Sequence, residues 1–576
     1  MRRIKPRKSK AKLCLIEDCM RHLDVPRTIK EVLLHEFADN FLDACDLELD
    51  LQEDNGTWTL TPRTDDMNIV GSTWAFDIKR DLNKRILRFK ARLCAQGFTQ
   101  VRGVDYYRKY SHTVPFDVLR LFVFKCATHG LEATEADYTT AYLNARVDTD
   151  IYMKQPPGFP AVDSDGSPLL GPNGEELVCK LNKAIYGLVQ SGLMWEEEHH
   201  STLKSFQWEQ CEAEPCIFRR KFDDVTCFIC TYVDNLFMGF PSDSPHRNTT
   251  LDELRQHYKI TDLGRMSHTL NIRIQQTPRI FHTTMDQESY IDDIMDKYKD
   301  FIKEYKLEPS PKTRVTPMVE TVADNIQQGD PENPMTLGWV SKCMQLGGKL
   351  NYASIATRPD ISAALAKCMR TASKATESTF KALLGIVVYL QETKHYKLNY
   401  GKGLGDPLKQ NILRYATDIR ADIWCDDDVI WFADASQGGS KPLQCNLGFI
   451  GGCLFSWKIG HFSWTTLSAC EAEYFAQSTA AMVLQAMKDV IKFLELDVQF
   501  PVISFCDNEV ATKISNGEYT TKHMKHVLTR MSYLIEQIRD GVIQLSHIST
   551  EGNVSDIGTK ILAPSVFHRF RALMIH

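Results

Sequence analysis

The chain has 576 residues, 43% of them hydrophobic and 25% charged, which is the composition of an ordinary soluble globular protein. This length exceeds what one hydrophobic core supports and predicts about three or four domains. The formal net charge of −6 excludes a positive field over the whole chain, so any binding to nucleic acid must come from local patches.

The apolar segments are short, and none approaches the roughly 20 residues that a transmembrane helix needs. The basic start of the chain lacks the apolar core of a signal peptide. Seventeen cysteines are scattered along the chain, many inside apolar runs, which favours buried free thiols over a disulfide framework. We therefore expect an intracellular protein.

The first twelve residues, "MRRIKPRKSKAK", contain seven lysines and arginines. They are interpreted either as a solvated tail or as an arm for nuclear import or nucleic-acid binding. Apolar residues at 25–50 have helical spacing and predict a helical segment. The proline- and glycine-rich stretch 156–174 predicts an exposed loop, and the proline-rich, polar stretch 307–336 predicts a domain boundary.

Strands and helices alternate after a further break at 401–428. Short strands with interleaved helices indicate an α/β or α+β domain of about 150 residues. The predicted elements are a strand at 429–433, strands within 446–457, a helix at 470–496, a strand at 502–506, a helix at 521–539 and a strand at 542–548.

The stretch "CFICTYVDNLFMGF" (227–240) consists of two apolar runs separated by Asp234 and Asn235, and it predicts two buried strands joined by a tight turn. Asp234 is interpreted either as a turn residue or as a metal ligand. Asp137, in "LEATEADYTTAYLNARV", follows a strand-like stretch and is interpreted either as a helix cap or as a second ligand. Enzymes that transfer phosphoryl groups often hold two divalent ions between carboxylates from different segments.

Seven blocks of sequence between about 55 and 400 resemble, in order, the polymerase region of copia-type (Pseudoviridae-like) retrotransposons. They are "FKARLCAQGFTQVRGVDYYRKYS", "ADYTTAYLN", "IYMKQPPGF", "VCKLNKAIYGLVQSGLMW", "YVDN", "TDLG" and "ATRPDISAA". The resemblance implies a reverse transcriptase with a right-hand fold of fingers, palm and thumb. The partners that it implies are an RNA template, a DNA primer and deoxynucleoside triphosphates.

The same resemblance assigns roles to individual residues. Asp137 and Asp234 match the metal ligands, and Tyr142 matches the aromatic residue beside the sugar of the incoming nucleotide. Lys90 and Arg92 match a basic pair suited to a triphosphate, although they are equally interpreted as solvated strand charges. Gln190 matches a glutamine that contacts the incoming nucleotide or the template.

Two departures from the family pattern bear on activity. Asn235 stands where the family has the second aspartate of a Tyr-Val-Asp-Asp turn, and Ser191-Gly192 replaces the usual Ala-Pro. Asparagine keeps one carbonyl oxygen but lacks the negative charge that attracts a divalent ion. We therefore expect polymerase activity to be impaired.

Four carboxylates recur in order in the last third of the chain: Asp434 and Asp507 end predicted strands, Glu473 lies on the predicted long helix, and Asp556 follows a strand. They could converge on two ions for phosphodiester hydrolysis, or they could be helix caps and a surface charge. With "SACEAEY", "CDN" and "SDIGTK", this order resembles the ribonuclease H domain of copia-type elements. The resemblance implies a role for the four carboxylates in cleaving the RNA of an RNA/DNA hybrid.

Together these features predict an α+β fold, with a right-hand polymerase, a connection region and an α/β ribonuclease H-like domain. The expected division is a basic tail and helical segment at 1–54, polymerase at 55–306, connection at 307–428 and ribonuclease H-like domain at 429–576. The cofactor is expected to be Mg²⁺, with Mn²⁺ as an alternative. Localisation is expected in the cytoplasm, an element particle or the nucleus. The competing hypothesis is a decayed or co-opted remnant that binds nucleic acid without DNA synthesis.

Overall fold

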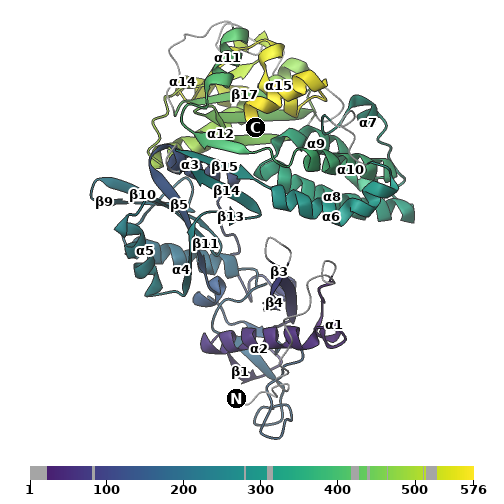
Figure 1. The fold of residues 1–576 in the computed structure, drawn as a ribbon. Helices are drawn as coiled ribbons and strands as arrows, with labels where there is room; N and C mark the ends of the chain where they lie inside the picture. Colours follow the sequence, from purple (N-terminus) through teal and green to yellow (C-terminus); the bar gives the residue numbers. More distant parts are fainter. Residues whose placement is uncertain are drawn as a thin grey trace.

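The computed structural model contains both helices and sheets (Figure 1). The basic tail and the first part of the helix expected at 521–539 lie outside the residues that it describes. The described residues are 23–80, 85–277, 281–307, 315–416, 427–436, 442–463, 465–466, 468–509, 512–513 and 528–576.

The N-terminal part pairs two helices with two small sheets. The helical segment expected at 25–50 is present as α1 (Ile29–Leu33) and α2 (Ala38–Asp54). Helix α2 packs on β4, where the buried Glu48 carboxylate accepts a hydrogen bond of 3.3 Å from the Leu93 N–H. The sheets have the orders β1-β7-β6-β2 and β3-β4. Their strands are β1 (Trp58–Pro62), β2 (Ile69–Val70), β3 (Ser72–Arg80), β4 (Ile86–Ala95), β6 (Tyr152–Met153) and β7 (Leu177–Leu181).

A six-stranded antiparallel sheet, here called the central sheet, has the order β12-β5-β11-β10-β9-β8. The hairpin predicted at 227–240 is its β10-β11 pair, so that prediction is confirmed. The strands are β5 (Leu131–Tyr138), β8 (Glu209–Gln210), β9 (Ile217–Phe222), β10 (Val225–Tyr232), β11 (Asn235–Pro241) and β12 (Ile260–Arg265).

Helices cover both faces of the central sheet, which explains why its strands β10 and β11 are largely apolar on both sides. Phe228 and Cys230 pack in the cluster that contains α3 (Phe116–Thr128). Cys227 and Ile229 point to the other face and pack with residues of α4 (Ser191–Ser205) and α5 (Pro245–Arg255).

The region after the central sheet combines a four-stranded sheet with a group of helices. Strand β16 pairs with β15, so residues 282–286 and 398–401 share one sheet across the break that the sequence predicts at 307–336. The strands are β13 (His268–Thr269), β14 (Ile272–Thr277), β15 (His282–Asp286) and β16 (Leu398–Gly401). The helices are α6 (Glu288–Glu304), α7 (Glu320–Asp324), α8 (Pro334–Ala356), α9 (Ser362–Met369) and α10 (Glu377–Glu392).

A five-stranded sheet, the C-terminal sheet, has the order β19-β18-β17-β20-β21. Strand β17 is antiparallel to β18 and parallel to β20, and β20 is parallel to β21. The strands are β17 (Val429–Ala435), β18 (Leu443–Ile450), β19 (Cys453–His461), β20 (Val502–Cys506) and β21 (Ile543–His547). The accompanying helices are α11 (Asp406–Tyr415), α12 (Ala469–Phe493), α14 (Leu528–Arg539) and α15 (Pro564–Met574). These elements follow the predicted order, and the predicted α+β fold is confirmed.

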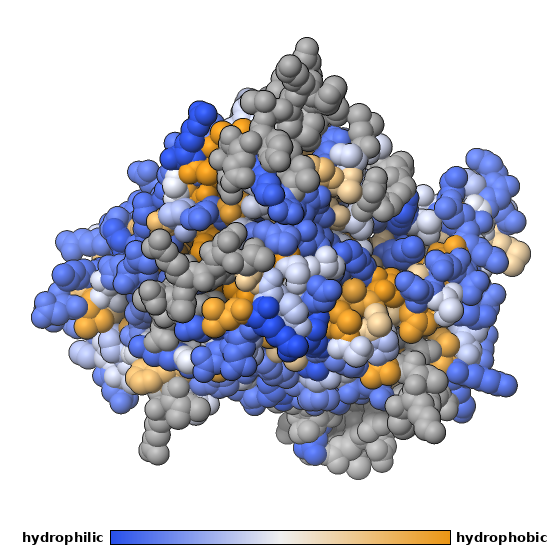
Figure 2. Space-filling view, turned by 90° about the horizontal axis from the view of Figure 1, so that it is seen from above, coloured by the Kyte–Doolittle hydropathy of each residue, from blue (hydrophilic) through white to orange (hydrophobic). Residues whose placement is uncertain are grey.

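One hydrophobic cluster extends from α3 through the helices of the middle region to α15. The face drawn in Figure 2 is largely hydrophilic, with apolar residues in separate patches. All cysteines of the described residues are free, and all but Cys94 and Cys470 are buried, as predicted. Within the described part of the chain, no helix has the length and apolar character required to cross a membrane.

Candidate active sites

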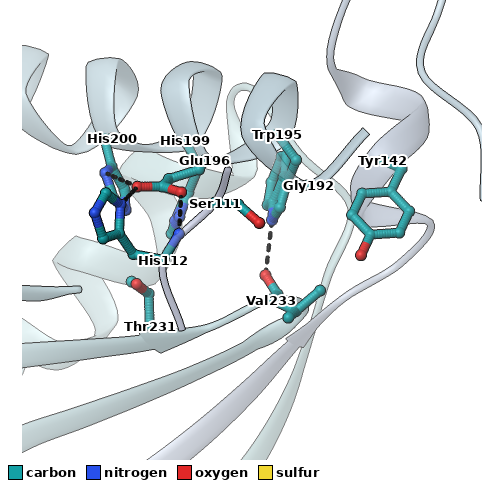
Figure 3. A pocket seen from close by; sticks show the side chains of 10 residues that line it. All are labelled: Ser111, His112, Tyr142, Gly192, Trp195, Glu196, His199, His200, Thr231 and Val233. Carbon is teal, nitrogen blue, oxygen red and sulfur yellow. Dashed lines mark hydrogen bonds and ion pairs between the residues drawn. The ribbon is translucent and has the colours of Figure 1, made fainter. Parts of the chain in front are cut away.

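The turn between β10 and β11 contains only two residues, Val233 and Asp234, because Tyr232 pairs directly with Asn235. Val233 has a φ of 54°, a left-handed conformation that β-branched residues rarely adopt. Such strain persists where the surroundings over-determine it, often at functional sites. Here the Trp195 indole N–H donates a hydrogen bond of 2.7 Å to the Val233 carbonyl oxygen (Figure 3).

The turn places Asp234 beside Asp137. Asn235 is the register partner of Asp137, and the Tyr138 N–H donates a 2.9 Å hydrogen bond to the Asp234 carbonyl oxygen. Burial raises the pKa of Asp137, and the neighbouring charge of Asp234 raises it further. Asp137 lies inside β5, and Thr140 precedes the following 3₁₀ helix (Ala141–Asn144), so the helix-cap interpretation of Asp137 is wrong.

A third carboxylate, which the sequence reasoning missed, lies two residues before Asp137. Alternation along β5 puts Glu135 on the same face of the strand as Asp137. Glu135 is buried, and burial raises its pKa to about 7, with contributions from the charges of Asp137 and Asp234. The only sequence signal for it is the Glu-Ala-Asp spacing on a strand.

The basic pair Lys90 and Arg92 lies on β4 and acts electrostatically on this site. Their positive charges, with that of Arg88, lower the pKa of Asp137 against the effect of burial. Burial lowers the pKa of Lys90, and repulsion by Arg92 lowers it further. The Arg92 guanidinium carbon lies 4.9 Å from the centre of the Tyr186 ring. These cations therefore belong to the electrostatic environment of the aspartates, and their contact with a triphosphate stays a prediction.

Tyr142, in the 3₁₀ helix after β5, lies at the edge of this site. Its ring meets the Tyr186 ring edge to face, with 4.9 Å between centres. Tyr142 lines a pocket together with Trp195 and Val233. Figure 3 shows the Tyr142 hydroxyl pointing toward the side of this pocket where the Val233 turn lies. Burial raises its pKa, as does the charge of Asp234. This placement is compatible with a position of the Tyr142 ring beside the sugar of an incoming nucleotide.

Gln190, in contrast, is completely buried. Its amide nitrogen donates a 2.7 Å hydrogen bond to the Asp105 carbonyl oxygen, and its amide oxygen accepts one of 3.1 Å from Gln100. Both ends of the amide are thus engaged within the protein. A contact with nucleotide or template would require Gln190 to rearrange.

The unusual Ser191-Gly192 pair forms an ordered start to α4. The Ser191 hydroxyl donates a hydrogen bond of 2.5 Å to the Ile185 carbonyl oxygen. A Cβ atom at Gly192 would lie only 2.6 Å from the Ser111 hydroxyl oxygen, so glycine suits the close approach of residue 111. One turn later, both carboxylate oxygens of Glu196 bind His112, its backbone N–H and its Nδ1, each at 2.6 Å (Figure 3).

A second set of carboxylates gathers at one edge of the C-terminal sheet. Asp434 near the end of β17 and Asp507 directly after β20 lie at the same edge because these strands are parallel neighbours. One carboxylate oxygen each of Asp434, Asp507 and Asp556 lies within 4.8 Å of the others. Glu473 and Asp507 form a similar group with the Cys506 sulfur.

Helix α12 is held against the C-terminal sheet by hydrogen bonds of Glu473 itself and of Gln477, one turn later. The Ala435 N–H donates a 3.2 Å hydrogen bond to Glu473 Oε1. One turn later, Gln477 donates to the carbonyl oxygens of Ala433 (3.4 Å) and Phe505 (3.1 Å), which links α12 to both β17 and β20. Glu473 is buried against the sheet, so the surface-charge interpretation is wrong.

Crowding of like charges shows in the pKa values of this second set. Burial raises the pKa of Glu473 well above its usual value, and Asp434 raises it further. Burial and Asp434 likewise raise the pKa of Asp507, and they raise that of Asp556 to about 7. An oxygen-rich site of this kind matches the ligand preference of hard divalent cations such as Mg²⁺.

Lys560 is a further residue that the sequence reasoning did not assign. Its ammonium nitrogen lies 2.6 Å from Asp556 Oδ1 and 4.0 Å from Asp434 Oδ2. The only signal was its place four residues after Asp556 in "SDIGTK". The lysine supplies a positive charge at the second carboxylate site.

The first carboxylate site lies in a part of the chain that matches a known protein family. Residues 55–308 match the family model of reverse transcriptases (RNA-dependent DNA polymerases). The chain is similar over nearly its whole length to retrotransposon Pol polyproteins of plants, and the reverse transcriptase match lies within this similarity. The resemblance predicted from the sequence is confirmed.

Two curated plant relatives illustrate the extent of this similarity. The Pol polyprotein from transposon TNT 1-94 of Nicotiana tabacum is 26% identical over 555 residues, 95% of this chain and 39% of that protein. The Pol polyprotein from transposon RE1 of Arabidopsis thaliana is 26% identical over 550 residues, 95% of this chain and 34% of that protein. The chain thus spans little more than a third of these relatives.

Solved structures with a similar arrangement have low sequence identity to the chain. A foamy viral protease-reverse transcriptase in complex with double-stranded DNA covers 88% of this chain and 69% of its own, with a TM-score of 0.46 and 13% identity. A ribonuclease H1 in complex with an RNA/DNA hybrid covers 22% of this chain and 88% of its own, with a TM-score of 0.17 and 19% identity.

Proposed function

We propose that the chain is an RNA-directed DNA polymerase joined to a ribonuclease H, with two separate sites for phosphoryl transfer. The observation that carries the proposal is the β10-β11 turn, which brings Asp234 beside Asp137 within the residues that match the reverse transcriptase family model. The proposed substrates are deoxynucleoside triphosphates and a DNA primer paired with an RNA template.

At the first site, Asp137 and Asp234 would hold divalent ions, Mg²⁺ or Mn²⁺, through carboxylate oxygens. Such ions, when bound, stabilise charge on phosphoryl oxygens and acidify an attacking oxygen. Lys90 and Arg92 act electrostatically on Asp137 and would bind the negatively charged triphosphate. Tyr142 would pack beside the sugar, where a ribose 2′-hydroxyl would collide with its ring.

At the second site, Asp434, Glu473, Asp507 and Asp556 would hold the ions used in hydrolysis of the RNA strand. Two observations support this role. The four side chains converge at one edge of the sheet. Among the described residues, Lys560 is the one basic side chain that forms ion pairs with them. Water is the attacking group here, and the leaving group is the ribose 3′-oxygen of the cleaved strand.

Asn235 is expected to weaken the first site. At 4 Å and an effective dielectric constant of 20, two unit charges interact by about 4 kcal/mol, and a divalent ion roughly doubles this before desolvation offsets it. A net loss of a few kcal/mol is consistent with these values, and each 1.36 kcal/mol lost from the transition state lowers the rate about tenfold.

The test compares three preparations in primer extension and in hybrid cleavage: the unaltered chain, Asn235→Asp and Asp507→Asn. We expect Asn235→Asp to raise synthesis by about two orders of magnitude or more and to leave cleavage unchanged. Asp507→Asn should abolish cleavage and leave synthesis unchanged. Robust synthesis by the unaltered chain would refute the charge argument, because Asn235 would then suffice.

The competing hypothesis, a remnant that only binds nucleic acid, is not favoured. All four carboxylates of the second site are present and converge, and Ser191-Gly192 forms an ordered helix start. A preparation without cleavage or synthesis, even after Asn235→Asp, would revive it.

A further inference from the structure

The C-terminal ends of two helices from later parts of the chain point at basic side chains of the central sheet and its covering helix. Helix α8 ends at Ala356 and helix α12 at Phe493. The last carbonyl groups of a helix have no partner within the helix and carry partial negative charge. Cations and hydrogen-bond donors therefore stabilise these ends.

Arg120, on α3, binds the end of α8 and a strand of the C-terminal sheet together. Its guanidinium donates hydrogen bonds of 3.0 Å to the carbonyl oxygens of Ile355 and Ala356 and one of 2.7 Å to that of Phe455 on β19. The guanidinium carbon also lies 3.6 Å from the centre of the Trp457 ring. Arg120 is only 3% exposed, and although burial lowers its pKa to about 10, it stays charged at neutral pH.

Two more cations reach the end of α12. The Lys125 ammonium, also on α3, donates a 2.8 Å hydrogen bond to the Glu495 carbonyl oxygen. Arg219, on β9, donates one of 3.3 Å to the Phe493 carbonyl oxygen, and its guanidinium carbon lies 4.4 Å from the centre of the Phe493 ring. In Figure 1, α3 lies beside the C-terminal sheet, below α12.

The five acceptors that lie on later parts of the chain are backbone carbonyl oxygens, and Arg219 also donates hydrogen bonds of 2.8 and 2.9 Å to the Glu209 carboxylate on the neighbouring strand β8. A carbonyl at a helix end cannot rotate independently of its helix, whereas a surface carboxylate can follow a moving partner through several rotamers. Contacts of this kind therefore restrict the orientation of one element relative to another. Trp457 adds a further link, because its indole N–H donates a 2.9 Å hydrogen bond to the Ser354 carbonyl oxygen near the end of α8.

We propose that Arg120, Lys125 and Arg219 are positioning residues that cap the C-terminal ends of α8 and α12 and hold the two carboxylate sites at one separation. The docking is a property of the folded chain and does not depend on catalysis. Its consequence for cleavage rests on the proposed function, because both sites must act on one duplex. An RNA strand would then be cut at a defined distance behind the primer end.

Hydrogen exchange on the full chain tests the docking without requiring activity. We expect Arg120→Met, and separately Arg219→Met, to raise exchange of amides in the last turn of the helix that each contacts by roughly tenfold or more. Arg120→Lys keeps the charge but lacks the planar fork, so it should restore protection only in part. The matched control is Arg255→Met, an exposed cation paired with Asp252 on α5.

Arg219 is at the edge of the contact, with a side chain 28% exposed, so its variant tests the proposal even if Arg120→Met does not fold. The docking would be overturned if Arg219→Met left hydrogen exchange at the end of α12 unchanged. It would also be overturned if Arg255→Met raised this exchange by the same amount.

The length of RNA products tests positioning itself. On an RNA/DNA hybrid with a defined primer end, the unaltered chain should cut within a narrow set of positions, and Arg219→Met should broaden that set. A residue that only stabilised the fold would change the amount of cleavage and not its position. An unchanged product pattern together with faster exchange would overturn the positioning role. If the unaltered chain did not cleave at all, the proposed function would fail, and the exchange experiment would still decide the docking.

Discussion

Arg358 and Asp360 form an ion pair in which both side chains are almost completely buried. The guanidinium donates two hydrogen bonds to the carboxylate, of 2.9 and 2.7 Å, and the Tyr389 hydroxyl donates a third of 2.7 Å. The block "ATRPDISAA" marked these residues only as part of a family resemblance. The structure gives them a physical role, which is to satisfy a buried charge between α8 and α10.

Asp360→Asn should lower the free energy of unfolding by about 3–5 kcal/mol, because it leaves the buried Arg358 charge without its counter-charge. Chemical denaturation measures the loss. Asp252→Asn, which breaks the exposed pair with Arg255, should cost less than about 1 kcal/mol. Equal losses in the two variants would contradict the argument.

Tyr142 is expected to discriminate against ribonucleotides. Tyr142→Ala opens space beside the sugar, so the preference for deoxynucleotides should fall, whereas Tyr142→Phe keeps the ring and should keep the preference. Single-nucleotide incorporation in the Asn235→Asp background measures both. Unchanged discrimination in Tyr142→Ala would remove this role from Tyr142.

At the scale of elements, the β10-β11 hairpin depends on a hydrogen bond from α4 to its turn. Trp195→Phe keeps an aromatic ring but leaves the Val233 carbonyl without the Trp195 donor, which should cost about 1–3 kcal/mol. We expect slower synthesis in the Asn235→Asp background, while hybrid cleavage is unaffected.

Trp208→Phe is the matched control for that change. Trp208 is also buried under the central sheet, but its indole N–H has no hydrogen-bond partner within the described residues. Its replacement should therefore affect synthesis little. Equal effects of the two substitutions would show that ring volume matters and the hydrogen bond does not.

The hairpin and the C-terminal elements could be predicted from the sequence because their apolar runs are short and bounded by polar residues. The carboxylates were assigned mainly by the family resemblance, because Asp137 and Asp434 lie inside strands and only Asp507 directly follows one. Glu135 and Lys560 were missed, since their proximity to the sites depends on strand alternation and on a short 3₁₀ turn. Contacts between α3 and helix ends could not be predicted, because a helix end shows no sequence signal for a partner over 200 residues away.

At the scale of the whole molecule, the basic arm at 1–12 is expected to contribute to nucleic-acid affinity through its seven cations. Each phosphate contact adds about 0.9 to the slope of log affinity against log salt for duplex DNA. A chain starting at Asp24 should therefore bind duplex with a shallower salt dependence than the full chain. Identical slopes, measured from binding isotherms at several salt concentrations, would exclude a role for the arm.

Helix α3 also sets the order in which the protein can acquire its shape. Its residues Val118–Thr128 are all buried, yet Arg120 and Lys125 bind residues 335 and 370 positions later in the chain. A ribosome adding about 5–20 residues per second needs roughly 20 to 70 s to deliver those partners. During that interval the apolar surface of α3 is without its final cover. The nascent chain is therefore expected to depend on chaperones, and truncated chains that end before β19 should aggregate.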